Sequence, residues 1–189
     1  MDRQYLVFSK ESIDIKDRKE VISSFLGIKN IKTISSDIIS FSADDILKST
    51  ISKSVHTLSN DFNASLLLLV SPVDVPFSEY VLKKMSSFHS EGVFSLSQGI
   101  IELLMKNDEF IKTHLFSWFS GLDYTSAITG KTYVESGFSM AKSCTILSIH
   151  RNTMEYRLKK IKEQFNLDLR CFDDGILFLT YLSLSGICA

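Results

Sequence analysis

The segment 147–165 constrains the fold of this chain most, because its apolar residues recur with the spacing of a single helix face. The apolar positions lie four, three and four residues apart: Met154, Leu158, Ile161 and Phe165. Residues at these intervals form one stripe on an α-helix, so the stripe is expected to face a hydrophobic core. At 3.6 residues per turn, Asn152, Tyr156 and Lys159 fall on the opposite side. The sequence therefore predicts a helix over 150–165 with one buried face and one polar face.

The polar face of this helix carries side chains that suit contact with a polyanion. Thr153 and Lys160 lie beside the face, and Arg151 and Arg157 lie on its flanks. Arg and Lys contact phosphates, while Asn and Tyr near the start of a helix can read base edges in a major groove. We therefore interpret 150–165 as a candidate recognition helix for double-stranded DNA. An ordinary amphipathic surface helix is the alternative.

The residues before this helix are typical of a helix-turn-helix. Ser139 is a candidate N-cap for a short helix over 139–147, with Lys142 in its first turn. Only two residues separate this helix from the next. In a helix-turn-helix the shorter helix braces the recognition helix across the groove. A supporting first helix is expected over 131–136, with Gly137 as its stop.

The residues after the candidate recognition helix predict its end and one more helix. Asn166 tolerates the left-handed conformation that often ends a helix. Asp173 and Asp174 suit a helix N-terminus, and 176–184 is almost wholly apolar. This last helix is therefore expected to be buried, either by the N-terminal domain or by a second chain.

The run LSIHRNTMEYRLKKI at 147–161 resembles the C-terminal helix-turn-helix domain of bacterial purine-catabolism and sugar-diacid regulators, the PucR/CdaR type. The family pattern is a His-Arg-Asn-Thr tetrad, an apolar residue, then Tyr-Arg-Leu and a basic pair before Ile. The matching residues are His150, Arg151, Asn152, Thr153, Met154, Tyr156, Arg157, Leu158, Lys159, Lys160 and Ile161. The resemblance spans roughly the last 60 residues and rests on a contiguous motif of mixed polarity. It implies a DNA-binding transcriptional regulator.

The residues expected to contact DNA come from both helices of the motif. They are Ser139, Lys142, His150, Arg151, Asn152, Thr153, Tyr156, Arg157, Lys159 and Lys160. Asn152 and Tyr156 are expected to read bases, whereas Arg151, Arg157 and Lys160 hold phosphates. One such motif covers few base pairs, so we expect a homodimer on paired half-sites. The alternative is a protein-interaction module that keeps the fold without binding DNA. Neither an operator nor an effector ligand is identifiable from these residues.

The composition is that of a globular chain without a global attraction for nucleic acid. The 189 residues are 44% hydrophobic and carry a net charge of -1, so any affinity for DNA has to come from a local basic patch. The start of the chain is polar and the longest apolar block, Leu66–Val70, is too short to span a membrane, which favours the cytoplasm. The three cysteines form neither a CxxC pair nor an even set, so we expect neither disulfides nor a zinc site. No other metal site and no cofactor is expected.

The N-terminal part alternates between strand and helix patterns. Strands are expected over 4–9, 37–42 and 65–71. Helices are expected over 17–26, 44–60, 78–88, 97–106 and 109–119. The fully apolar strand Leu66–Val70 needs cover on both faces, which favours a central position in the sheet. The predicted fold is therefore an α/β or α+β sensing or interaction domain over 1–120, followed by an all-α helix-turn-helix domain over 121–189.

Catalytic motifs are fragmentary in this sequence. Gly130, Lys131 and Thr132 resemble the end of a phosphate-binding loop, but the glycine needed five positions before Gly130 is Thr125. Ser139 and Lys142 fit the S-x-x-K pattern of some acyl-transfer enzymes without its companion motifs. No acid, base and nucleophile cluster together along the chain, so the sequence does not predict an enzyme.

Overall fold

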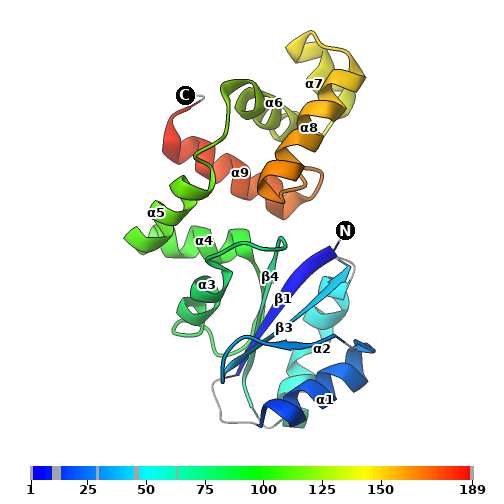
Figure 1. Cartoon of the computed structure of the whole chain (residues 1–189), viewed down its shortest axis with the longest axis vertical. Coiled ribbons are helices and arrows are strands. Elements are labelled where there is room, and N and C mark those ends of the chain that lie inside the picture. The colour runs from blue at the N-terminus through cyan, green and yellow to red at the C-terminus, as the bar shows by residue number, and fades with distance from the viewer. Residues whose placement is uncertain (1, 10–13, 29, 45–46, 63, 188–189) are drawn as a thin grey trace. The chain divides into compact units, whose positions relative to one another are not determined.

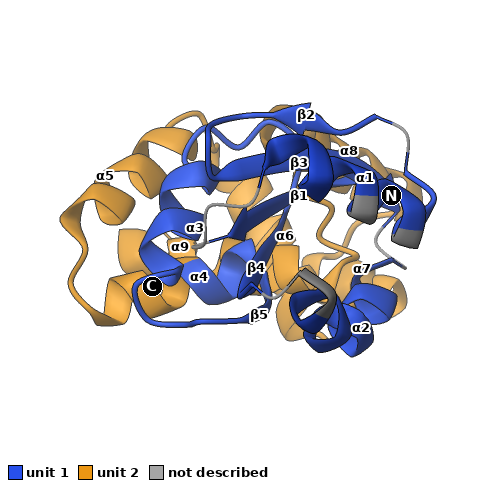
Figure 2. Cartoon of the chain, turned by 90° about the horizontal axis from the view of Figure 1, so that it is seen from below, with its two compact units in different colours: residues 1–99 blue, residues 100–189 orange. Residues whose placement is uncertain are grey.

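The structure is a computed structural model that describes residues 2–9, 14–28, 30–44, 47–62 and 64–187. The chain divides into two compact units, residues 1–99 (unit 1) and residues 100–189 (unit 2), shown in Figure 2. Among the described residues, no helix is long and apolar enough to cross a membrane.

Unit 1 is built on a five-stranded mixed sheet (Figure 1). Its strands, in spatial order, are β2 (Lys32–Thr33), β3 (Ile38–Asp44), β1 (Asp2–Ser9), β4 (Leu66–Ser71) and β5 (Gly92–Ser95). Strand β1 pairs antiparallel with both β3 and β4, and β4 pairs parallel with β5. The expected strand at 65–71 is therefore an internal strand, and all its residues are buried.

Helices cover both faces of this sheet, as the continuous apolar run of β4 requires. On one face, α1 (Ile15–Leu26) and α2 (Leu47–Phe62) pack on a single cluster. The cluster contains Tyr5, Val7, Ile22, Ile39, Phe41, Ile51, Val55, Leu58, Leu66, Leu68 and Val70. On the other face, α3 (Ser78–Met85) contacts β1 and β4.

The helix α4 (Leu96–Met105) begins in unit 1 and crosses the division between the units. A Cβ atom added at Gly99 would lie 2.5 Å from Val81 and 3.7 Å from Leu69. Gly99 therefore lets the start of α4 pack closely against α3 and β4. The sequence patterns predicted the helices of unit 1 but missed β2 and β5, because two and four residues are too few to show an alternating pattern. The first residues of the helix expected over 44–60 include 45–46, which lie outside the described residues.

Unit 2 is helical in its described residues. After α4 it contains α5 (Glu109–Trp118), α6 (Tyr124–Glu135), α7 (Met140–Leu147), α8 (Arg151–Phe165) and α9 (Phe172–Ser185). Its core is centred on the buried ring of Phe119, which stacks on Tyr181 at 4.3 Å between ring centroids. The rings of Phe165 and Phe178 lie 5.0 and 5.9 Å from the same ring.

The contacts of α5 and Phe119 group residues 100–120 with the helical unit, whereas the sequence patterns placed the domain boundary near Gly121. Helix α5 packs on α9, and the stack of Phe119 on Tyr181 joins residues that are distant in sequence. Helix patterns in the sequence do not show which helices pack together, because that packing depends on how their faces meet in three dimensions.

Helix α9 packs one face within its own unit. Leu177, Phe178, Tyr181 and Leu182 are buried, and α9 contacts both α5 and α6. The sequence pattern had suggested that either the N-terminal domain or a second chain covers this helix. These contacts within unit 2 weaken that reason for a second chain, although Phe172 at the start of the helix and Leu184 near its end remain 65% and 43% exposed.

Helix α6 is the central packing element of unit 2, because it contacts α7, α8 and α9. It begins at Tyr124, earlier than the expected 131–136, and Asp123 caps it by accepting a hydrogen bond from the backbone N–H of Ser126 at 2.9 Å. Gly130 lies inside this helix, where an added Cβ atom would come within 2.4 Å of Phe178 and 2.8 Å of Leu169. Gly130 thus permits close helix packing and does not belong to a phosphate-binding loop.

Candidate nucleic-acid interface

Helices α7 and α8 form a helix-turn-helix with a polar cap at the start of each helix. The hydroxyl of Ser139 accepts a hydrogen bond from the backbone N–H of Lys142 at 3.4 Å and caps α7. Ser148 ends α7 in the left-handed conformation, with φ at 52°. His150 caps α8, because its Nδ1 accepts a hydrogen bond from the backbone N–H of Asn152 at 3.2 Å. Ser139 and His150, both predicted to contact DNA, therefore also fix the geometry of the motif.

The apolar stripe predicted for α8 is confirmed. Met154 and Ile161 are fully buried, and Leu158 and Phe165 are 5% and 3% exposed. Asn166 ends the helix in the left-handed conformation, with φ at 55°, as its side chain led us to expect. The stripe fixes the rotation of α8 about its axis, and this rotation decides which side chains face outward.

The outward side of α8 carries exposed polar and aromatic side chains. We call Asn152, Tyr156, Lys159 and Glu163 the outer face; all four are exposed. Tyr156 is 68% exposed, which is unusual for a large aromatic side chain. Lys142 on α7 and Arg151 and Thr153 at the start of α8 are exposed as well. These residues include most of the predicted DNA contacts.

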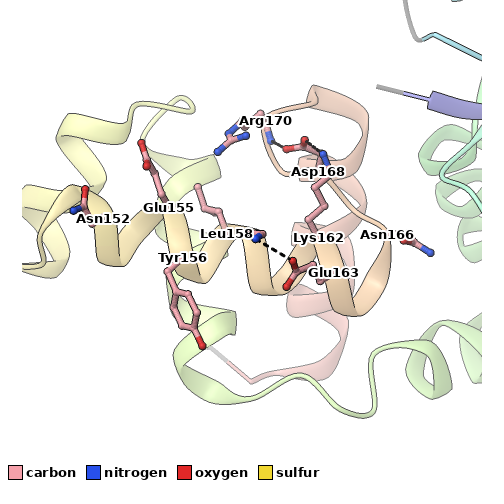
Figure 3. Close-up of a pocket in the computed structure, with 10 residues that line it drawn as sticks. Asn152, Glu155, Tyr156, Leu158, Lys162, Glu163, Asn166, Asp168 and Arg170 are labelled. Atoms are coloured by element: carbon pink, nitrogen blue, oxygen red, sulfur yellow. Dashed lines mark hydrogen bonds and ion pairs between the residues drawn. The ribbon is translucent and has the colours of Figure 1, made fainter.

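A groove runs along α8 beside the outer face and has a volume of about 730 Å³ (Figure 3). The turn after the helix forms its other side. The lining residues are Asn152, Glu155, Tyr156, Leu158, Lys159, Lys162, Glu163, Asn166, Asp168 and Arg170. The groove brings the exposed side chain of Arg170 to the same surface as Asn152 and Lys159. The sequence patterns did not single out Arg170, because it lies outside the periodic segment.

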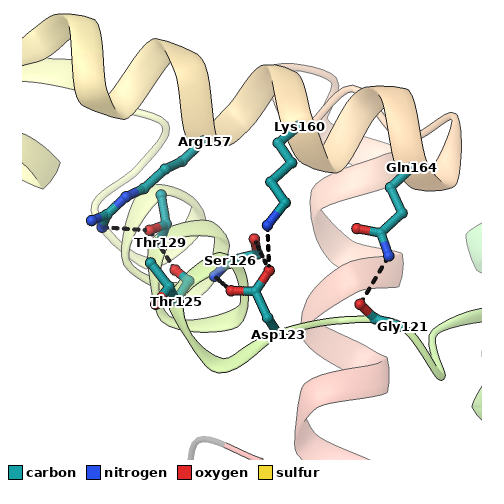
Figure 4. Close-up of polar contacts among 8 residues, drawn as sticks. All are labelled: Gly121, Asp123, Thr125, Ser126, Thr129, Arg157, Lys160 and Gln164. Carbon is teal, nitrogen blue, oxygen red and sulfur yellow. Dashed lines mark hydrogen bonds and ion pairs between the residues drawn. The ribbon is translucent and has the colours of Figure 1, made fainter.

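A second side of α8 is tied to α6 and to the loop before it (Figure 4). We call Arg157, Lys160 and Gln164 the anchored flank. The Nζ of Lys160 donates to Oδ2 of Asp123 at 2.8 Å, and Nη1 of Arg157 donates to Oγ1 of Thr129 at 3.3 Å. The amide of Gln164 donates to the carbonyl of Gly121 at 2.8 Å. Arg157 and Lys160, expected as phosphate contacts, thus have partners within unit 2.

Asp123 is the centre of the anchored flank, because it both caps α6 and pairs with α8. Its Oδ2 also accepts a hydrogen bond from the hydroxyl of Ser126 at 2.8 Å. The hydrogen bond from Lys160, followed by those from Ser126, holds the pKa of Asp123 far below its usual range. The same pair raises the pKa of Lys160. The capping role is readable from sequence, but the partner is not, because Lys160 lies 37 residues away.

The turn after α8 is held by two carboxylates. The Nζ of Lys162 donates to Asp168 at 2.9 Å, and the backbone N–H of Arg170 donates to the same carboxylate at 3.1 Å. The buried Asp174 accepts from the backbone N–H of Asp168 at 2.8 Å. Partial burial raises the pKa of Asp168, but the hydrogen bonds from Lys162 and Arg170 outweigh it and leave this pKa below its usual value. The turn therefore presents Arg170 on an ordered backbone.

Two further ion pairs lie along α8 itself. The Nε of Arg151 is 2.9 Å from Glu155, and the Nζ of Lys159 is 3.4 Å from Glu163. Helix α8 is fully described, and of its five basic residues four pair with a carboxylate while Arg157 bonds to Thr129. Within the described ranges, no three His, Cys, Asp or Glu side chains are grouped so that they could hold a metal ion.

Comparison with known proteins confirms the resemblance found in the sequence. Residues 129–184 match the family model of the PucR C-terminal helix-turn-helix domain. No curated protein matches the chain. The chain is similar in fold to the crystal structure of a regulator of polyketide synthase expression from Bifidobacterium adolescentis, with a TM-score of 0.51 and 16% identity. The similarity covers 98% of this chain and 81% of that one, and at this identity it concerns the fold alone.

Proposed function

We propose that this chain, with its PucR-type helix-turn-helix domain at 129–184, is a transcriptional regulator that binds double-stranded DNA through α8. One observation carries the proposal: the stripe buried in the core turns Asn152 and Tyr156 outward at the start of a helix-turn-helix recognition helix. Amide and hydroxyl groups at this position can reach base edges when the helix lies in a major groove. The DNA-binding domain would then lie within residues 121–189 and pack on residues 100–120 of the same unit, and the sensing or interaction domain would lie within residues 1–120.

In this proposal the predicted contacts have different roles. Asn152, Thr153 and Tyr156 face bases, while Lys142, Arg151 and Lys159 contact phosphates around the groove. Ser139 and His150 cap α7 and α8, and the N-termini of these helices would approach the DNA backbone. The backbone N–H groups at a helix N-terminus favour binding of phosphate. Arg157 and Lys160 contribute mainly by holding α8 against α6, although exposed ion pairs are worth only about 0–1 kcal/mol and phosphate can compete for them.

A protein-interaction role for the helix-turn-helix is the second candidate. The observation that favours it is the balance of charge on α8, where four of five basic side chains already face a carboxylate. A surface of this kind attracts a polyanion less than an unpaired basic face does. In that case the fold is retained and the exposed residues around Tyr156 contact another protein.

Binding to duplex DNA as a function of salt separates the two candidates. A phosphate-contacting protein shows a linear fall of log affinity with log salt, with a slope of about -0.9 for each phosphate neutralised. We expect such a slope for a random-sequence pool and tighter binding to sequences that the full chain selects from that pool. A flat response, or a pool from which no sequence is enriched, would reject DNA binding and leave the interaction role.

We also propose that the active form is a homodimer that acts in the cytoplasm, where bacterial DNA lies. A single helix-turn-helix contacts too few base pairs for adequate specificity, and two copies double the number of base pairs that are contacted. Sedimentation equilibrium of the full chain with specific duplex should then give the mass of the duplex plus twice the chain mass of 21.4 kDa. One chain per duplex at saturation would exclude the dimer.

A further inference from the structure

The charge balance of α8 depends on two glutamates that differ from the other carboxylates near it. Asp123 caps α6 and Asp168 orders the turn after α8, so both have roles in the fold. Glu155 and Glu163 instead each pair with the basic residue one helical turn earlier on α8. Their side chains are 43% and 65% exposed, and both lie along the groove beside the outer face.

The positions of these glutamates place negative charge among the proposed DNA contacts. Glu155 lies between Asn152 and Lys159 in the sequence of α8, and Glu163 belongs to the outer face itself. Three acidic residues line the groove, namely Glu155, Glu163 and Asp168. Three basic residues line it as well, namely Lys159, Lys162 and Arg170, so the charges of the groove cancel. A phosphate strand that approaches this surface meets carboxylates as well as cations.

Carboxylates on such a surface affect operator and random DNA unequally. Random DNA is held almost wholly by phosphate contacts, so a nearby negative charge weakens this binding directly. Operator DNA is also held by base contacts, which the carboxylates do not oppose in the same measure. Paired cations must leave their glutamates before they contact phosphate, and only a well-fitted complex compensates for that loss. Both effects raise the ratio of specific to non-specific binding.

We propose that Glu155 and Glu163 set the discrimination of this protein between operator and random DNA by restraining Arg151 and Lys159 and by repelling phosphate. This inference rests on the proposed DNA binding and goes beyond it, because it assigns a role in specificity to two acidic residues. They would act on specificity without contacting bases.

The test compares the full chain, the variant Glu155→Gln/Glu163→Gln and a control variant of equal charge. Gln keeps the size and the carbonyl oxygen of Glu while it removes the charge. The control is Glu79→Gln/Glu109→Gln, which breaks two other exposed ion pairs, with Lys83 at 2.9 Å and Lys112 at 3.9 Å. Both variants change the net charge equally, so a difference between them reports the position of the charge. Thermal melts establish that all three proteins are folded.

The probes are a pool of short random-sequence duplexes and a duplex that the unsubstituted chain has selected from this pool. We expect the α8 variant to bind the random pool at least about tenfold more tightly at low salt. The slope of log affinity against log salt should be steeper by up to about 1.8, since two more cations reach phosphates. Binding to the selected duplex should gain less, so the ratio of the two affinities falls. The control variant should keep the ratio of the unsubstituted chain.

Equal ratios in the α8 variant and the control would overturn the inference while the proposed DNA binding stands. If no form of the protein binds either duplex at any salt, the proposed function and the inference both fail. Binding that appears only in the α8 variant would overturn both, because the unsubstituted chain would then bind no operator that it could discriminate from random DNA. Should the double variant melt early, Glu163→Gln gives the test with Glu79→Gln as its control of equal charge, because both partners of the pair with Lys159 are highly exposed.

Discussion

The outer face and the anchored flank of α8 carry similar residue types and have different partners. On the outer face, Lys159 pairs locally with Glu163, four residues away on the same helix. On the flank, Lys160 pairs with Asp123 and Gln164 bonds to Gly121, both of which are distant in sequence. Side chains that make long-range contacts fix the position of the helix, whereas those with local contacts remain available to a ligand. The type of a residue on α8 therefore says less about its role than the direction in which it points.

The largest effect on stability is expected for the buried stripe of α8, because its packing orients both the outer face and the anchored flank. Leu158→Ala removes a side chain that is 5% exposed, and we expect a loss of about 2–5 kcal/mol in the free energy of unfolding of unit 2. The single tryptophan, Trp118, lies in this unit and reports its unfolding by fluorescence. Tyr156→Ala on the outer face should change stability by less than about 0.5 kcal/mol. Equal melts for the two variants would show that the helix is oriented differently.

The next effect compares an amide on each side of α8. Asn152→Ala on the outer face should lose about 1–3 kcal/mol of discrimination between selected and random duplex while the melt stays unchanged. Gln164→Ala on the flank loses the hydrogen bond to Gly121, so we expect about 0.5–1.5 kcal/mol less stability and no loss of discrimination. Both variants are measured by competition binding and by Trp118 fluorescence. The assignment of sides fails if Gln164→Ala loses discrimination and Asn152→Ala does not.

A smaller effect separates the two roles of Asp123. Asp123→Ala removes the cap of α6 and the partner of Lys160, and should cost about 0.5–2 kcal/mol. Asp123→Asn keeps a good capping residue but removes the charge, so we expect a loss of only about 0.2–1 kcal/mol. Equal losses would mean that the cap contributes nothing beyond the ion pair with Lys160, whereas an unchanged stability of Asp123→Asn would mean that the ion pair contributes nothing.

Lowering the pH titrates the same group. The pKa of Asp123 in the folded chain is below its unfolded value, which is about 3.9. Its contribution to stability is therefore fully present above about pH 4 and is lost as the pH falls below that value toward the folded pKa. The difference in melting temperature between the unsubstituted chain and Asp123→Asn should accordingly shrink from pH 5 to pH 3. A difference that is constant or grows over this range would contradict the proposed pair.

The smallest effect is expected for two lysines. It concerns the slope of log affinity for DNA against log salt. Lys142→Ala on exposed α7 should flatten the slope for random DNA by about 0.9, as expected for one lost phosphate contact, without a change in stability. Lys160→Ala should lower stability only slightly and change the slope less, because Asp123 already holds this lysine. A larger slope change for Lys160 than for Lys142 would make Lys160 a phosphate contact, and the flank would then be part of the DNA surface.

Local patterns account for what the sequence predicted correctly. The stripe from Met154 to Phe165, the cap at Ser139 and the stop at Asn166 each depend on the conformation of one short segment. The apolar strand at β4 was predicted for the same reason, since a run without polar residues must be covered on both faces. The start of α6 was missed, because Thr125, Ser126, Thr129 and Gly130 are poor helix formers. Packing on Phe178 and Leu169 stabilises that helix instead.

The sequence by itself determined that α8 exists, where it begins and ends, and which family its motif resembles. Only the tertiary structure decided which of its basic residues face outward, which are held by Asp123 and Thr129, and that the turn at Arg170 joins the same surface. The physical reason is the range of the interactions. Capping and periodicity act within one helical turn or along one helix, so they are written in neighbouring residues. Ion pairs between elements depend on how separate helices pack, and that packing is set by the whole core of unit 2.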